Sequence, residues 1–451
     1  MNIIIAGSGK LGLTLARQLI AEGHDITLID NNNLVLEEAV EQIDAIAVCG
    51  NCASKDILLT AGVKHTDLVI AATNADELNL LCCLTAHGIN PNVHTIARIR
   101  NPEYAEQIMT MPETFPLSLT VNPEKQAAIE IERLLKYPGF LRRDTFAKGR
   151  VEIVELRVDE QSKLCNVALS DLSNIVKCKV LVCAVLRAGN AVAPKGDFIL
   201  QKGDRVFVTA PTDTLTLLLK NLGIITRRVR HVMICGGGRI SYYLASLLEK
   251  DNITVQLIDR NRERCSELAA LLPNTAVIYG DCSSQSLLDS QRIDQVDALA
   301  SLTGMDETNM IISLHANSRK VPQIITKLGR GEREIADALP LGSIICPKEL
   351  SCNQIVRYVR AMQNQTGAAV SVHTIADGQV EAVEFLVDSS TKNCGKPLKQ
   401  LKLKPNVLLA SITHGIETQI PGGDSTFTEG DTVVVVTSGR GILKNINDIF
   451  A

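Results

Sequence analysis

The chain has 451 residues, of which 45% are hydrophobic and 3% aromatic, and it carries a formal net charge of −4 with no Trp. A prior of roughly 150 residues per domain predicts about three domains. Because the chain is mildly acidic and poor in aromatic side chains, it has little with which to bind a phosphate backbone or to stack on bases, so we expect no nucleic-acid partner.

The first 122 residues alternate between strand-like and helix-like patterns. Short apolar or β-branched runs predict strands at 2–6, 25–30, 45–49, 68–72 and 93–99, with helices between them, the first at 9–22. This alternation predicts an α/β domain with a parallel, doubly wound, Rossmann-like sheet. No uncharged apolar run approaches the ~18–20 residues of a membrane-spanning helix, so we expect the chain not to cross a bilayer.

The turn after the first strand carries the most specific signal. It reads Gly7-Ser8-Gly9-Lys10-Leu11-Gly12, it opens the first helix, and Asp30 closes the next strand. In a dinucleotide-binding fingerprint, such glycines let the backbone approach a pyrophosphate and the acid accepts hydrogen bonds from ribose hydroxyls. Because Asp30 would repel a 2′-phosphate, the sequence favours NAD(H) over NADP(H).

A second, smaller domain follows the first. Residues 123–149 are predicted as a crossover helix, with the helical pattern strongest at 123–137. Residues 150–225 are predicted as a small α+β domain with strands at 151–157, 180–186 and 205–209. Residues 226–231 contain three arginines and are interpreted as a solvated linker.

The second half of the chain repeats the first. Gly236, Gly238 and Asp259 recur at the spacing of Gly7, Gly9 and Asp30, and a Gly-Asp pair at 203–204 in the small domain recurs at 430–431. The repeat unit is therefore a two-domain module, which raises the expected count to four domains. We expect a second Rossmann-like domain at 231–346, a crossover helix at 347–368 and a second small α+β domain at 369–451.

The second turn departs from the fingerprint. Ser241 stands where the third glycine is expected, and Arg260 and Arg262 lie close to Asp259. These differences leave three possibilities open, namely NAD(H), another phosphate-rich nucleotide, or a turn that has lost its ligand. Arg98 and its counterpart Lys327 each end a strand, where they are interpreted either as phosphate contacts or as surface cations.

The reactive side chains do not form a catalytic or metal-binding pattern. The thirteen cysteines indicate a reducing compartment, and Cys49-Gly50-Asn51-Cys52 lacks the second ligand pair of a zinc site. Because the first strand begins at Asn2, no secretory signal fits before it, and we expect a cytoplasmic protein. The eight histidines are expected in loops and seams, each as a surface or capped residue; they include His24, His65, His231, His373 and His414.

The whole chain resembles the TrkA family of bacterial peripheral subunits, which are built from tandem RCK domains, also called KTN domains. The doubled module carries this resemblance together with the motifs GSGKLG, LID, AATNADELN and TIARIRNPEY. It implies that an RCK C-terminal domain follows each Rossmann-like domain and that the first site binds NAD(H). The implied contacts are Gly7, Ser8, Gly9, Lys10, Leu11, Asp30, Thr73, Asn74 and Arg98. The corresponding second site, for NAD(H) or another nucleotide, is Gly236, Gly237, Gly238, Arg239, Ile240, Asp259, Thr303, Gly304 and Lys327.

The resemblance also implies a function. Members of this family assemble as a homo-oligomeric ring, commonly a tetramer, beneath a membrane potassium-translocating subunit of the Trk type. They lie on the inner face of the cell membrane through that partner only, and they regulate ion flux without performing chemistry. Two alternatives remain open from the sequence, an NAD-dependent dehydrogenase and a nucleotide or redox sensor that acts on another partner.

Overall fold

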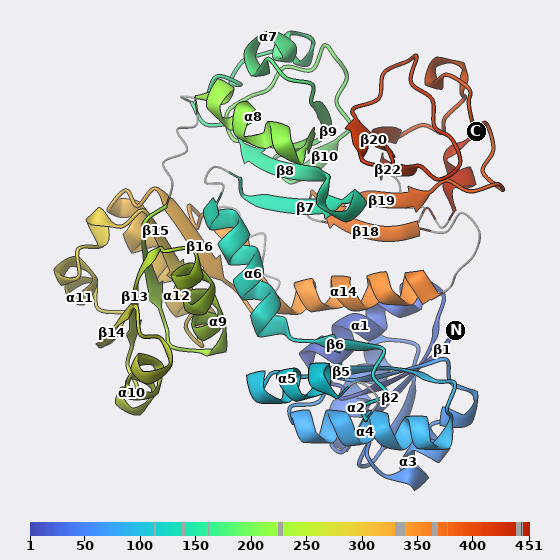
Figure 1. The fold of residues 1–451 in the computed structure, drawn as a ribbon, viewed down its shortest axis with the longest axis vertical. Helices are drawn as coiled ribbons and strands as arrows, with labels where there is room; N and C mark the ends of the chain where they lie inside the picture. The colour runs from blue at the N-terminus through green and yellow to red at the C-terminus, as the bar shows by residue number, and fades with distance from the viewer. Residues whose placement is uncertain are drawn as a thin grey trace. The chain divides into compact units, whose positions relative to one another are not determined.

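The structure of the chain is a computed structural model that describes residues 1–111, 114–136, 140–160, 162–223, 229–329, 339–362, 369–376, 378–438, 443 and 445–451. The chain divides into two compact units, residues 1–127 with 347–358 and residues 128–346 with 359–451. Figure 1 shows the elements with the labels used below. Among the described residues, no helix is both long enough and apolar enough to cross a membrane.

The first unit contains a six-stranded parallel sheet in the order β3-β2-β1-β4-β5-β6. Its strands are apolar on both faces, as a sheet covered by helices on both sides requires. The order reverses between β1 and β4, where the sheet of a doubly wound fold binds its ligands. The elements are β1 Asn2–Ala6, α1 Lys10–Ala21, β2 Asp25–Asp30, α2 Asn33–Gln42, β3 Ile46–Cys49, α3 Lys55–Thr60, β4 Leu68–Ala71, α4 Asp76–Ile89, β5 His94–Arg98, α5 Pro102–Thr110 and β6 Leu119–Val121. The helix α6 Pro123–Lys136 begins in the first unit, and its residues 128–136 belong to the second.

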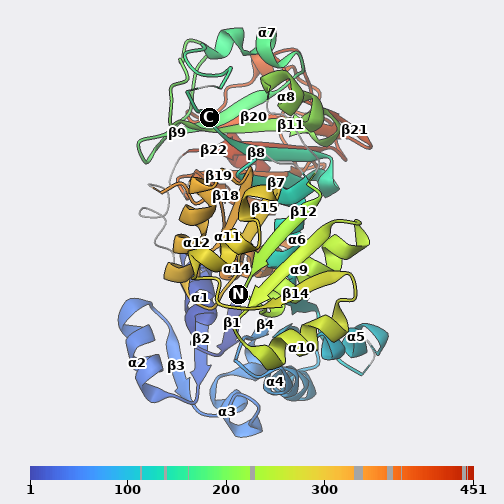
Figure 2. The same cartoon turned by 90° about the vertical axis from the view of Figure 1, so that its left-hand side faces the viewer.

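The second unit repeats this sheet in the order β14-β13-β12-β15-β16-β17, again with every pair parallel. Helices α9, α10 and α12 contact its strands (Figure 2). The elements are β12 His231–Cys235, α9 Arg239–Lys250, β13 Thr254–Asp259, α10 Arg262–Leu271, β14 Thr275–Tyr279, α11 Gln285–Ser290, β15 Ala298–Ser301, α12 Asp306–Ser318, β16 Gln323–Lys327 and β17 Ser343–Ile345. The helix α14 Pro347–Met362 comes next in the chain, and its residues 347–358 belong to the first unit. The sequence repeat is thus a repeat of fold, and both parallel sheets that the sequence predicts are confirmed.

Two antiparallel five-stranded sheets form the small domains of the second unit, in the orders β10-β9-β11-β8-β7 and β18-β19-β22-β20-β21. The first small domain comprises β7 Arg142–Phe146, β8 Val151–Arg157, α7 Leu172–Val176, β9 Leu181–Arg187, β10 Asn190–Val192, β11 Arg205–Pro211 and α8 Leu215–Leu222. The second comprises β18 Ala369–Ile375, β19 Val380–Leu386, β20 Val407–His414, β21 Glu417–Gln419 and β22 Thr432–Thr437. Each sheet has its own apolar core, and an antiparallel sheet follows each Rossmann-like domain, which agrees with the predicted fold class.

The two small domains also share a core. Phe146 and Phe207 of the first pack in one cluster with Ile375 and Val434 of the second. Asp144 on β7 accepts a 2.9 Å hydrogen bond from His373 on β18. Because these two residues occupy equivalent positions in the repeats, their contact lies next to a pseudo-twofold axis.

The predicted crossover segments are partly helical. In the segment 123–149, α6 ends at Lys136 and residues 142–146 form the edge strand β7, which pairs with β8. Asp144 and Phe146 lie two residues apart on one face of this strand, where both contact His373 of β18. In the segment 347–368, α14 ends at Met362, and residues 363–368 lie outside the described residues. Residues 226–228 of the predicted linker also lie outside them.

Candidate functional site

The Gly-rich turn between β1 and α1 is closely packed on one side and open on the other. Gly7 has φ +101°, and a Cβ there would lie 3.0 Å from the backbone nitrogen of Thr73. A Cβ on Gly12 would lie 1.9 Å from the carbonyl oxygen of Gly7. Gly9 has open space at its Cβ position and is the N-cap of α1, with no side-chain cap. No side chain therefore caps the start of α1, and a helix start of this kind is suited to binding an anion.

Asp30 ends β2 beside this turn and fixes its shape. Its Oδ2 accepts a hydrogen bond from the backbone N–H of Ser8 at 2.7 Å, and its Oδ1 accepts one from Asn32 at 3.0 Å. The residue is half-buried. Each carboxylate oxygen can accept a second hydrogen bond, so the same group can hold the turn and bind a ribose hydroxyl.

Asn79 on α4 is a site-forming residue that the sequence analysis missed. Its side chain is fully buried. Oδ1 accepts hydrogen bonds from the backbone N–H of Thr73 at 2.9 Å and from its hydroxyl at 2.7 Å, while Nδ2 donates to the carbonyl oxygen of Arg98 at 2.8 Å. Asn79 thus ties the end of β4 to the end of β5. The pattern Thr-x-x-Asp-Glu-x-Asn, present in both repeats, is the sequence signal that could have identified it.

Asp76, in the same pattern, holds the residues after β5. Its Oδ2 accepts hydrogen bonds from the backbone N–H groups of Arg100 and Asn101, each at 2.7 Å. Arg98 itself is half-buried, and its Nη2 lies 3.9 Å from Glu124 Oε1. The predicted cation at the end of β5 therefore lies near the first residues of α6.

The second repeat rebuilds the same arrangement residue by residue. Asp259 accepts hydrogen bonds from the backbone N–H groups of Gly237 at 2.5 Å and Asn261 at 2.7 Å. Asn309 accepts from Thr303 N–H at 2.8 Å and donates to the carbonyl oxygen of Lys327 at 3.0 Å. The N-cap of α1 has φ −66° and ψ −177°, and that of α9 has φ −69° and ψ −178°. The buried Ser241 therefore leaves the dihedral angles at this cap unchanged.

A cavity of about 540 Å³ opens at this second site. Of the residues predicted for the site, those that line it are Gly236, Gly237, Gly238, Asp259, Thr303, Gly304 and Lys327. Arg239 and Ile240 do not line it. Ile240, like Leu11 in the first repeat, is buried beneath the helix, so at these two positions only the backbone can reach a ligand.

The second site is more basic than the first. Arg260 and Arg264 line the cavity, whereas Arg262 does not. Arg264 Nε donates to the carbonyl oxygen of Gly237 at 2.9 Å, and its Nη1 pairs with Glu267 at 2.8 Å. Lys327 Nζ donates to the carbonyl oxygen of Thr303 at 2.5 Å. Arg264 and Lys327 are thus bound to backbone carbonyl oxygens of the turns after β12 and β15.

The cysteines are free thiols in the structure. Cys49 is exposed and Cys52 is buried. A hydrogen bond with Cys82 lowers the pKa of the Cys52 thiol and raises that of Cys82, and burial raises the pKa of Cys183 to about 12. Within the described residues, no group of three or more His, Cys, Asp or Glu side chains is placed to hold a metal ion.

Three of the histidines are buried and do not lie at the surface, namely His24, His315 and His373. Their exposed fractions are 5%, 8% and 6%. His373 is buried because Asp144 accepts its hydrogen bond and the ring of Phe146 packs at 4.6 Å between centroids. The sequence could not show this contact, because its partners belong to different repeats.

Comparison with known proteins identifies the modules. The TrkA-N domain model matches residues 3–113 and 232–341, and the TrkA-C domain model matches residues 153–223 and 382–447. The chain is 31% identical over 457 residues to the Trk system potassium uptake protein TrkA of Vibrio alginolyticus, covering 100% of this chain and 98% of that protein. It is 32% identical over 452 residues to a TrkA homolog of Archaeoglobus fulgidus, covering both chains completely.

Solved structures agree on the fold. The crystal structure of the GsuK RCK domain superposes with a TM-score of 0.62 at 17% identity, covering 97% of this chain and 92% of that one. The GsuK channel bound to NAD superposes with a TM-score of 0.61 at 17% identity, covering 97% and 77%. Because both domain models match twice and the relatives align from end to end, the chain belongs to the TrkA family.

Proposed function

We propose that this chain is a nucleotide-binding regulatory subunit of a Trk-type potassium uptake system. The observation that carries the proposal is the doubled site. A Gly-rich turn bonded to an aspartate at the end of the next strand, and a threonine bonded to a buried asparagine six residues later, each occur twice in one chain. The full-length similarity to proteins named Trk system potassium uptake protein TrkA supports the transport context.

In this proposal the first site binds NAD(H). The pyrophosphate lies on the open N-terminus of α1 at Gly9, where no Cβ intervenes, and Asp30 accepts from the adenosine ribose. Arg98 and the Thr73 turn complete the site at the ends of β5 and β4. Asp30 disfavours a 2′-phosphate by like charge, so NADP(H) is expected to bind more weakly.

The second site binds NAD(H) or another nucleotide in the cavity beside Asp259. Its volume of about 540 Å³ falls in the range of small-molecule sites. Gly238 has open space at its Cβ position, as Gly9 does, so a phosphate can reach the amides of α9. Arg260 and Arg264 add positive charge that the first site lacks, which suits a ligand richer in phosphate.

The chain acts through a membrane partner. We propose that it assembles as a homo-oligomeric, tetrameric ring on the cytoplasmic face of the cell membrane, attached through a Trk-type potassium-translocating subunit. Nucleotide binding changes the geometry of the ring and so sets potassium flux. The subunit itself transfers no hydride, because regulation requires only binding.

Calorimetric titration of the full chain with NADH, NAD⁺, ATP and ADP tests the doubled site. We expect two nucleotide sites per chain. The variants Gly9→Val and Gly238→Val fill the open space at each helix start, so each should remove one site and leave the other intact. A parent-like stoichiometry in both variants would place the nucleotides elsewhere.

Reconstitution tests the transport context. Vesicles that contain a Trk-type membrane subunit should show potassium flux that depends on the added chain and on which nucleotide is present. Gly9→Val is the matched control, because it should bind the membrane subunit and lose the response that depends on the first site. Equal flux with and without the chain, for every nucleotide, would contradict the proposal.

A further inference from the structure

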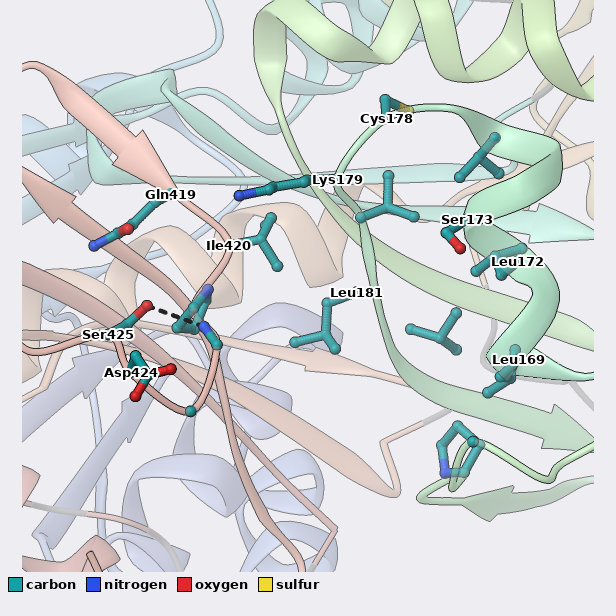
Figure 3. A pocket seen from close by; sticks show the side chains of 18 of the residues that line it. Leu169, Leu172, Ser173, Cys178, Lys179, Leu181, Gln419, Ile420, Asp424 and Ser425 are labelled. Carbon is teal, nitrogen blue, oxygen red and sulfur yellow. Dashed lines mark hydrogen bonds between the residues drawn. The ribbon is translucent and has the colours of Figure 1, made fainter. Parts of the chain in front are cut away.

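A cavity outside the candidate nucleotide sites lies between the two small domains. Its volume is about 910 Å³. One wall comes from α7 and β9 of the first small domain and the facing wall from residues 419–426 after β21 of the second. Figure 3 shows Leu169 and Leu172 on the first wall, Ile420 and Ser425 facing them, and Lys179 extending toward Gln419.

The cavity has an apolar side and a positively charged side. Leu172, Val176 and Val182 belong to the core of the first small domain and form part of its floor. Lys179 and Lys195 line it as well, and neither ammonium group has a hydrogen-bond or ion-pair partner among the described residues. Asp424, the one carboxylate in the described lining, already pairs with Lys399 at 2.5 Å. The unbalanced charge at the cavity is therefore positive.

The lining favours a single anionic group over a nucleotide. The described residues that line the cavity include no Arg that could bind a phosphate with two parallel hydrogen bonds, whereas Arg260 and Arg264 line the cavity beside Asp259. Isolated lysines act as point charges and suit a single anionic group. An aliphatic surface beside them suits a saturated hydrocarbon chain.

The facing wall is preformed. Ser425 Oγ accepts a hydrogen bond from Gly422 N–H at 3.0 Å, and the carbonyl oxygens of Ser425 and Gly423 accept from Leu398 N–H at 2.9 Å and Lys399 N–H at 2.8 Å. Such internal bonds hold the wall in place before a ligand arrives, which reduces the ordering cost of binding.

We propose that this cavity binds an aliphatic carboxylate, with its carboxylate at Lys179 and Lys195 and its chain along the leucine and valine floor. The site depends on neither nucleotide site, because none of its described lining residues belongs to a Rossmann-like domain. A ligand in this position contacts both small domains at once, so it can bias their arrangement only to the extent that it binds one arrangement better.

Titration of the full chain with decanoate below its micelle concentration tests the site. We expect one saturable site per chain, unaffected by saturating NADH, and binding of decanol at least tenfold weaker. The double variant Lys179→Met and Lys195→Met should weaken decanoate at least tenfold, whereas Lys404→Met, an exposed lysine outside the cavity, should not. Ser173→Trp, at an exposed lining position on α7, should block the chain-binding side.

Several outcomes overturn the assignment. Decanoate binding that is absent, unsaturable, or unchanged in both the double lysine variant and Ser173→Trp removes the site. If the double lysine variant instead weakens ADP binding in a chain that also carries Gly9→Val and Gly238→Val, the ligand class is wrong. The nucleotide titrations of the parent chain are independent of these results, so a failure here leaves the proposed function standing.

Discussion

Replacing Asp30 by Ala should weaken NADH binding and loosen the turn that receives it. The carboxylate accepts hydrogen bonds from the backbone N–H groups of Ser8 at 2.7 Å and Asn32 at 3.0 Å, and in our proposal it also accepts from the adenosine ribose. A hydrogen bond to a charged group contributes ~1.5–3 kcal/mol, which corresponds to a roughly 10- to 100-fold loss of NADH affinity. Because the residue is half-buried and water can replace part of the loss, we expect the free energy of unfolding to fall by only about 1–2 kcal/mol.

Isothermal calorimetry and urea denaturation measure the two effects separately. Nicotinamide mononucleotide, which lacks the adenosine ribose, should lose less affinity than NADH in Asp30→Ala. Asp25→Ala is the matched control, because Asp25 is an exposed acid at the other end of the same strand. A folded Asp30→Ala protein that binds NADH as tightly as the parent would refute the placement of the ribose at Asp30.

Three further predictions follow from the described contacts. Asn79 does not contact the ligand, but Asn79→Ala should reduce NADH affinity at the first site because Thr73 is then no longer tied to β5. Asn309→Ala should reduce nucleotide affinity at the second site only. Calorimetry of both variants checks this. Burial alone would raise the pKa of the Asp144 carboxyl, but Arg142 and the hydrogen bond from His373 hold it below its usual range, so this ion pair stabilises the fold above pH ~4 and its contribution is lost as the pH falls below that value. Asp144→Asn should therefore lower the free energy of unfolding by about 3 kcal/mol at pH 7 and by less at pH 3, as denaturant titrations at the two pH values would show. NADH oxidation with 2-oxo acids, aldehydes or quinones should stay at the buffer rate, and a steady turnover that Gly9→Val abolishes would restore the dehydrogenase alternative.

The parallel sheets were predictable because their signals are local. Strand, glycine turn, helix and acid lie within the first thirty or so residues of each repeat, and each is dictated by backbone sterics or by burial of a continuous apolar run. The repeat of this pattern in the second half of the chain supported the prediction of two such sheets. The structure agrees, because Asp259 accepts the same backbone hydrogen bond as Asp30 despite the change from Gly12 to Ser241.

The contacts that the sequence did not predict join segments distant along the chain. Asn79 connects the ends of two strands, and its amide gives no periodic signal within α4. His373 is buried only because a residue 229 positions earlier, Asp144, lies against it. The cavity between the small domains likewise has walls from both repeats, and single-sequence patterns do not report which distant surfaces meet.

The two candidate nucleotide sites have the same backbone geometry at the helix N-cap, but their turns make different contacts before a ligand binds. In our proposal this difference bears on regulation. In the second site Arg264 bonds to the carbonyl oxygen of Gly237, so the turn is tied to α10 before any ligand binds, whereas Val35 stands at the equivalent position of the first site. A ligand shifts a two-state assembly only by the difference between its affinities for the two states, about 1.4 kcal/mol for each tenfold preference. A ligand changes the conformation of a turn less when that turn is already fixed by other contacts. In our proposal the first site is therefore the better placed of the two to convert nucleotide binding into a change of geometry, and equivalent sites around a symmetric assembly would add their individual biases to one shared equilibrium.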